Sequence, residues 1–130
     1  MNDGEWNRGE AVKRDMDLVR RILFEAEELP ALDAGERLDI EGYSQEEISY
    51  HLKIMAQASL IEARASRYAG AGYWEIRGLT WRGHEFLDHA RDTSRWKKAL
   101  ELAKEKVGVL SFEALKQILE RLVANSLVAL

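Results

Sequence analysis

The feature that most constrains the fold of this chain is a predicted helix that runs, without a linker, into two short segments of alternating apolar residues. Ser44 is followed three residues later by Glu47, which is the spacing of a capping box, and this predicts a helix over residues 45–58. The alternating segments fill residues 60–80, with glycines between them over residues 67–73. Two such segments around a glycine-containing turn predict an antiparallel hairpin. The helix and the hairpin must then bury their apolar faces in one shared core.

Four further helices are predicted, because apolar residues recur at steps of three and four positions. They are expected over residues 12–28, 81–92, 93–107 and 112–127. The first helix ends before Pro30, since the residue preceding a proline resists helical geometry. Residues 31–43 are predicted to form a loop with a short extended piece at residues 38–40. Gly83 lies inside a predicted helix, where glycine costs about 1 kcal/mol relative to alanine.

Length and composition indicate one globular domain of a cytoplasmic protein. The chain has 130 residues, of which 46% are apolar, and this is enough to bury a core. It has no cysteine, which excludes disulfides, thiol catalysis and cysteine-based zinc sites. No apolar run approaches the roughly 20 residues of a membrane span, so no membrane partner is expected.

The charge of the chain is unevenly distributed. The net charge is −4, and residues 1–92 hold 12 basic and 19 acidic side chains, whereas residues 93–130 hold seven basic and four acidic ones. An acidic total disfavours a protein that coats nucleic acid without regard to sequence. It leaves room for a sequence-specific binder with a local basic patch, and four arginines lie between residues 60 and 82.

The order of the predicted elements resembles that of winged-helix DNA-binding modules. The segment YSQEEISYHLKIMAQASLIEA resembles the part of such regulators that forms the recognition helix and starts the hairpin, which is called the wing. The segment RGLTWRGHEFLDHARD resembles the stretch after the wing, where a Leu-Thr-x-x-Gly turn opens the next helix.

The whole chain also resembles a family of small uncharacterised bacterial and phage proteins with a domain of unknown function. The matching segments are KRDMDLVRRILFEAEE, IEGYSQEEISYHLKIMAQASLIEA and LTWRGHEFLDHARD. The resemblance implies a bacterial or prophage origin and no particular activity. It also implies a winged-helix-like fold. Together with the order of the elements, this predicts an α+β, mostly α-helical fold, in which a winged helix-turn-helix-like domain with a β-hairpin wing fills residues 12–92 and a C-terminal helical extension fills residues 93–130. Residues 1–11 are expected to be a flexible N-terminus.

Two features depart from the winged-helix pattern. Residues 31–43 lack the helix that normally braces the recognition helix and contacts backbone phosphate. Ser59 stands where such regulators usually have glycine, in a turn that often needs a positive φ angle. Both departures weaken the expectation of DNA binding.

The polar face of the predicted helix over residues 45–58 is the first candidate DNA-binding surface. In this hypothesis the helix enters a major groove, where hydroxyl and amide groups contact base edges and a lysine contacts phosphate. The candidate residues are Gln45, Ser49, Tyr50, Lys53 and Gln57. The alternative is a solvated helix face, since Glu46 and Glu47 would repel phosphate.

The arginines of the predicted hairpin are the second candidate surface. Arg64, Arg67 and Arg77 are expected either to enter a minor groove or to pair with backbone phosphates. The alternative assigns them to the solvated face of the strands, with Glu62 and Glu75 as cross-strand partners.

No catalytic, cofactor or metal site is predicted. The segment HEFLDH has its second histidine, His89, five residues after His84, whereas a zinc-protease helix needs a spacing of four. His51 is expected to be a half-buried structural residue. The sequence has no nucleophile elbow and no glycine-rich phosphate loop, so a non-enzymatic protein is expected.

The last helix carries an apolar stripe that needs a partner. One alternative is packing beneath the first helix, and the other is the interface of a homodimer formed through the C-terminal helices, because DNA regulators commonly bind paired half-sites. Together these patterns predict a DNA-binding transcriptional regulator. The alternative hypothesis is a non-enzymatic protein–protein interaction module that has kept a winged-helix fold without DNA binding.

Overall fold

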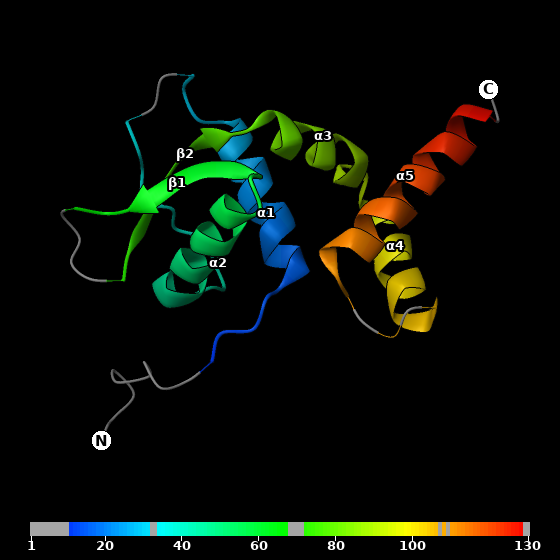
Figure 1. Cartoon of the computed structure of the whole chain (residues 1–130), viewed down its shortest axis with the longest axis horizontal. Coiled ribbons are helices and arrows are strands. Elements are labelled where there is room, and N and C mark those ends of the chain that lie inside the picture. Colours follow the sequence, from blue (N-terminus) through cyan, green and yellow to red (C-terminus); the bar gives the residue numbers. More distant parts are fainter. Residues whose placement is uncertain (1–10, 32–33, 68–71, 107, 109, 129–130) are drawn as a thin grey trace.

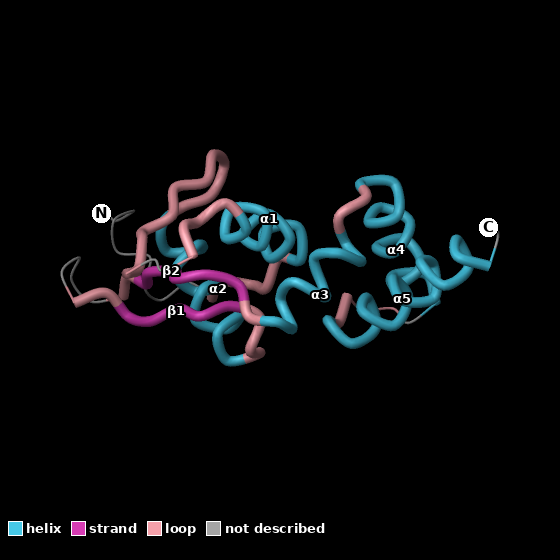
Figure 2. Tube along the Cα trace, turned by 90° about the horizontal axis from the view of Figure 1, so that it is seen from above, coloured by secondary structure: helices cyan, strands magenta, loops and turns pink. Residues whose placement is uncertain are grey.

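The computed structural model describes residues 11–31, 34–67, 72–106, 108 and 110–128. Its elements are α1 (Met16–Glu27), α2 (Gln45–Gln57), β1 (Ile61–Ala65), β2 (Trp74–Leu79), α3 (Trp81–Ala90), α4 (Thr93–Lys106) and α5 (Phe112–Val128). Figure 1 shows α1, α2 and the β1–β2 hairpin at one end of the molecule and α4 and α5 at the other, with α3 running between the two groups. Figure 2 shows the same division from above. The fold is thus α+β and mostly helical, as predicted, whereas the expected flexible N-terminus lies, except for Ala11, outside the described residues.

The first helix, α1, begins four residues later than predicted because an aspartate caps it. The Asp15 carboxylate accepts hydrogen bonds from the backbone N–H groups of Asp17 and Leu18, at 2.9 and 3.1 Å. Such a cap satisfies N–H groups that have no partner inside the helix, so α1 starts at Met16 rather than at Val12. Its apolar stripe is buried, as the periodicity predicts.

The predicted helix–hairpin unit is confirmed, including the capping box at the start of α2. Ser44 Oγ accepts from the N–H of Glu47 at 3.1 Å, and the Glu47 carboxylate accepts from the N–H of Ser44 at 2.9 Å. The helix ends at Gln57, and β1 begins only four residues later at Ile61. The two strands pair antiparallel, with a bulge after Glu62. The short connection ties the direction of the hairpin to that of α2.

The loop between α1 and α2 adds a minimal third strand at an unexpected position. Glu36 and Ile76 exchange both backbone hydrogen bonds, at 2.9 and 2.8 Å, as an isolated bridge on β2. The prediction of a strand at residues 38–40 is therefore wrong, although the two apolar residues of this segment, Leu38 and Ile40, are buried in the core. The described residues of this loop contain no helix, as the sequence predicts. Gly35 and Gly42 both adopt positive φ angles, which a right-handed helix does not contain.

The last helix, α5, packs mainly against α4 and α3. Leu115 and Leu119 of α5 and Trp96 of α4 are fully buried in the same apolar cluster as the core residues of α1 and α2. The prediction that α5 packs beneath α1 is therefore wrong, because its main packing partners are α4 and α3. The core is continuous across the boundary that the sequence places after residue 92.

A half-buried arginine fastens α1 to the junction between α3 and α4. Arg20 donates to the carbonyl oxygens of Ala90 and Arg91, at 2.7 and 2.8 Å, and so satisfies acceptors at the end of α3. Its guanidinium also lies 5.6 Å from the ring centre of Trp96, whose indole N–H donates to Asp17 at 2.8 Å. Burial lowers the pKa of Arg20, while Asp17 opposes that shift.

An ion pair at the surface also links α1 to the end of α3. Arg91 donates two hydrogen bonds to the carboxylate of Glu27, at 2.9 and 2.6 Å. These bonds lower the pKa of Glu27 and raise the pKa of Arg91. Both contacts hold α3 against α1 and thereby fix the start of α4.

The turn between α2 and β1 contains a strained serine, and this gives a first prediction. Ser59 has a φ angle of +61°, the left-handed conformation that the sequence led us to suspect at this position. We expect Ser59→Gly to stabilise the protein by about 0.5–1 kcal/mol, since glycine adopts this conformation without steric cost. Urea unfolding measures the change. The control is Ser94→Gly within α4, which should destabilise, and equal effects of the two changes would contradict the explanation.

Candidate nucleic-acid interface

The exposed side chains of α2 form a single row on the side of the helix away from the core. Glu46, Tyr50, Lys53 and Gln57 recur at steps of three and four residues and are all exposed, with 39% of the surface of Tyr50 open to solvent. This row offers an acid, a phenol, an ammonium group and an amide. Three of the five predicted contact residues of α2 thus lie together on an accessible face.

Ser49 is not part of that face, and the prediction of its exposure is wrong. Only 2% of its surface is exposed, and its Oγ accepts the backbone N–H of Trp74 at 3.1 Å. The hydroxyl therefore joins the middle of α2 to the first residue of β2. Helical periodicity places Ser49 at the border of the polar face, and only the tertiary fold shows that the hairpin covers that border.

Gln45 also has a structural role rather than an open side chain. Its amide nitrogen donates to the carbonyl oxygen of Leu38 and to the Asp39 carboxylate, at 2.6 and 2.7 Å. These bonds hold the preceding loop against the first turn of α2. The side chain is half-buried, so it is a weaker candidate for DNA contact than the sequence indicates.

The three hairpin arginines have different environments. Arg64 lies opposite Glu75 in the strand register, with 3.7 Å between Nε and the carboxylate, and it donates to the carbonyl oxygen of Ala34 at 3.0 Å. The cross-strand alternative is therefore confirmed for Arg64. Arg67 and Arg77 are exposed.

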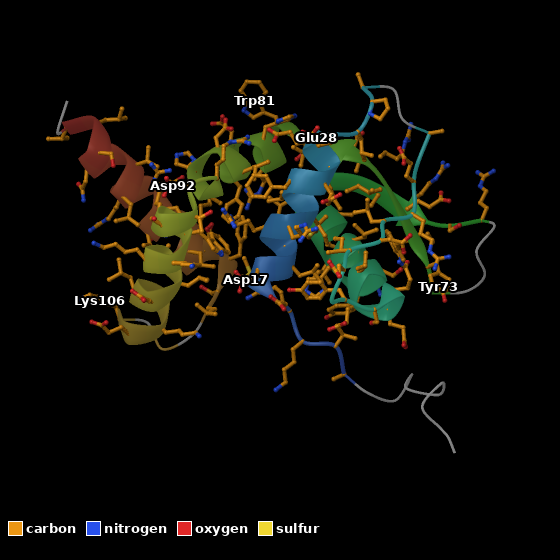
Figure 3. All side chains as sticks on the ribbon, turned by 180° about the vertical axis from the view of Figure 1, so that it is seen from behind. Asp17, Glu28, Tyr73, Trp81, Asp92 and Lys106 are labelled. Atoms are coloured by element: carbon orange, nitrogen blue, oxygen red, sulfur yellow. The ribbon has the colours of Figure 1, made fainter. Side chains whose placement is uncertain are left out.

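The aromatic residues near the hairpin also differ in their surroundings. Trp74 is half-buried and packs against the core. Tyr73 instead stacks with Arg37, whose guanidinium carbon lies 5.0 Å from the centre of the Tyr73 ring. Tyr68 lies outside the described residues. Trp81, the first residue of α3, is 82% exposed, and Figure 3 shows it at the outer edge of the molecule.

The acidic residues at the start of α2 do not all face outward. The Glu47 carboxylate is held in the capping box, so only the neighbouring Glu46 carries an exposed carboxylate in the first turn. Glu62 adds another exposed acid on β1. The row on α2 is therefore mixed in charge.

The N-terminal ends of α1 and α2 border a hollow of about 560 Å³. Three of its four carboxylates have structural tasks, since Asp15 caps α1, Asp17 accepts the indole N–H of Trp96, and Glu47 caps α2, whereas Glu46 is exposed. Burial, together with these carboxylates, raises the pKa of the nearby Tyr43. No pair of acids in this hollow is left in an arrangement that assigns a reaction, and the non-enzymatic character of the chain stays a prediction.

His51 is a core residue with two hydrogen bonds. Its Nε2 accepts the backbone N–H of Asp15 at 2.8 Å, and its Nδ1 lies 2.8 Å from the carbonyl oxygen of Glu47. It is 1% exposed, which is deeper than the half-buried position expected. Within the described part of the chain, no group of three or more His, Asp or Glu side chains is arranged to hold a metal ion.

The described residues contain no helix that is long and apolar enough to cross a membrane.

Comparisons with known proteins place the chain in a family. An uncharacterized protein of Haemophilus influenzae is 33% identical over 117 residues, which span 89% of this chain and 99% of that protein. No solved structure matches the chain. Residues 13–109 match the model of the family described as "Hypothetical protein (DUF2513)". The resemblance noted in the sequence is thereby confirmed, and the chain belongs to this family.

Proposed function

We propose that this protein is a DNA-binding transcriptional regulator, in which α2 enters a major groove and the β1–β2 hairpin lies along the phosphate backbone. The observation that carries the proposal is the fixed relation between the exposed row of α2 and the hairpin. The Ser49–Trp74 hydrogen bond and the short turn after Gln57 make the two elements one unit. A reading helix and a wing must keep such a relation to contact neighbouring parts of one duplex.

The chemistry of the row suits contact with a duplex. The amide of Gln57 and the phenol of Tyr50 can donate to and accept from base edges, and the ammonium group of Lys53 can neutralise a phosphate. Arg67 and Arg77 would add phosphate contacts along the hairpin. Arg64 is engaged with Glu75, so its role is to stiffen the hairpin.

The binding we propose depends on a few local cations in an acidic protein. Fluorescence anisotropy with labelled duplexes from the region upstream of its own gene should show fragment-selective binding that weakens as salt rises. Random duplex is the control for selectivity. Binding to neither duplex at micromolar protein and low salt would overturn the proposal.

The variants Lys53→Ala and Arg67→Ala should each weaken binding several-fold and lower the slope of log affinity against log salt by about 1. The physical reason is that each removed cation no longer displaces a counterion from the duplex. Lys98→Ala on α4 is the matched control, because it removes an exposed cation far along the chain from the proposed surface. Equal effects of all three variants would show that the affinity comes from overall charge and would contradict the proposed surface.

The protein–protein alternative has one observation in its favour, the exposed Trp81. Tryptophan is enriched among the residues that contribute most to the affinity of protein–protein contacts. This surface lies on α3 and α5, and its argument is independent of DNA binding.

A further inference from the structure

A groove lined by aromatic residues runs between α3 and α5. Trp81 and Phe86 contribute from α3, and Phe112 contributes from α5, with its ring centre 4.7 Å from that of Phe86. Charged groups border the groove on both helices, and the hollow holds about 300 Å³. Trp81 is 82% exposed, whereas Phe86 is buried and Phe112 is half-buried, so the solvent-facing part of this aromatic surface is mainly the indole of Trp81. An apolar surface of this kind is typical of a site where another protein surface docks.

The same face of α5 carries an apolar side chain at its other end. Leu127 is 62% exposed and lies fifteen residues after Phe112, so an ideal helix places it only about 60° around the axis from Phe112 and about 22 Å further along. Val123 lies on this face as well and is half-buried. The face thus has apolar residues toward both of its ends.

Two opposite charges lie in the middle of this face. Lys116 and Glu120 are one turn apart, both line the groove, and their charged groups are 3.5 Å apart. Both side chains remain partly open to solvent. A lysine and a glutamate in this order are self-complementary. When two copies of the helix pair antiparallel, the lysine of each copy lies next to the glutamate of the other.

We propose that a second copy of this chain covers the groove through antiparallel, two-fold pairing of α5 with α5. When the two-fold axis passes midway between Lys116 and Glu120, the lysine of each copy lies opposite the glutamate of the other copy. Leu127 of each copy then lies within one turn of Phe112 of the other, beside the groove that contains Trp81. Apolar ends and central charges are satisfied in both copies at once, as an isologous interface requires.

The pairing is tested by sedimentation equilibrium of the full chain over a hundredfold range of protein concentration. We expect a monomer–dimer equilibrium. Leu127→Asp should weaken the dimer by about tenfold or more, because it places a carboxylate against the aromatic groove. Lys104→Glu on α4 is the control for a charge reversal away from the interface and should leave the equilibrium unchanged.

Charge reversal distinguishes this pairing from other dimers. Lys116→Glu alone should weaken the dimer, because it sets glutamates opposite one another, and the double variant Lys116→Glu with Glu120→Lys should restore it. Circular dichroism of each variant reports whether the fold is kept. A monomer at every concentration, or a dimer that none of these changes at Leu127 and Lys116 weakens, would overturn the proposal. Neither result depends on whether the protein binds DNA.

Discussion

Replacing Gly83 by alanine should destabilise the protein by about 3 kcal/mol, a change opposite in sign to that expected from helix propensity alone. Gly83 lies in the first turn of α3, where the helix backbone approaches Leu60 in the turn between α2 and β1. A β-carbon at this position would overlap the carbonyl oxygen of Leu60 and would also crowd the side chain of Leu79, at 3.2 Å. That carbonyl oxygen already accepts the N–H of Thr80 at 3.2 Å, so the backbone has little freedom to withdraw.

Urea unfolding of the Gly83→Ala variant measures this effect. Glu85→Ala, at an exposed position of the same helix, is the matched control and should change the free energy of unfolding by less than about 0.5 kcal/mol. If Gly83→Ala proved as stable as the native chain, or more stable, the close approach of α3 to the α2–β1 turn would be refuted. From the sequence alone, Gly83 is predicted only to lower the stability of its helix. The contact that requires a glycine here joins residues far apart along the chain, so the sequence does not reveal it.

The second large effect is expected at His51. His51→Ala should lower the free energy of unfolding by about 2–4 kcal/mol, because it leaves the partly buried N–H of Asp15 without its acceptor and opens a cavity in the core. A backbone N–H can only donate, so Nε2 accepts from Asp15 and the proton on Nδ1 is donated to the carbonyl oxygen of Glu47. The ring therefore connects the cap of α1 to the first turn of α2.

A second histidine supplies the control for this prediction. His89 makes the same local contact, with its Nδ1 2.8 Å from the carbonyl oxygen of Glu85, and it is only half-buried. His89→Ala should therefore cost less than about 1 kcal/mol in the same unfolding measurement. Losses of equal size at the two histidines would show that the link between His51 and Asp15 contributes nothing to stability.

Local signals predicted most of the secondary structure. The capping box at Ser44 and the glycines between the strands act over a few residues, and the structure contains the elements that they mark. Ser59 is a similar case, since its positive φ angle follows from its place in the turn. These interactions join residues close together along the chain, so a single sequence is enough to predict them.

The predictions that failed depend on tertiary contacts. The burial of Ser49 and the bridge at Glu36 both follow from where β2 lies in the fold, which periodicity does not specify. In the same way, α3 turns Phe86 inward and leaves Trp81 in solvent, although both residues are apolar and aromatic. For the candidate interface, the sequence predicted the exposed row on α2 and offered Glu75 as a cross-strand partner, but it could not decide between that partner and DNA for Arg64.

The most direct test of the central claim is an NMR titration of the isotopically labelled protein with the duplex that binds best. The proposal predicts that backbone amide signals of α2 and of the hairpin shift, including those of Tyr50, Lys53, Gln57 and Arg67. Signals of α4 should remain in place. Shifts confined to α3 and α5, or no shifts at protein and duplex concentrations well above the micromolar range, would contradict the claim that α2 and the hairpin form a DNA-binding surface.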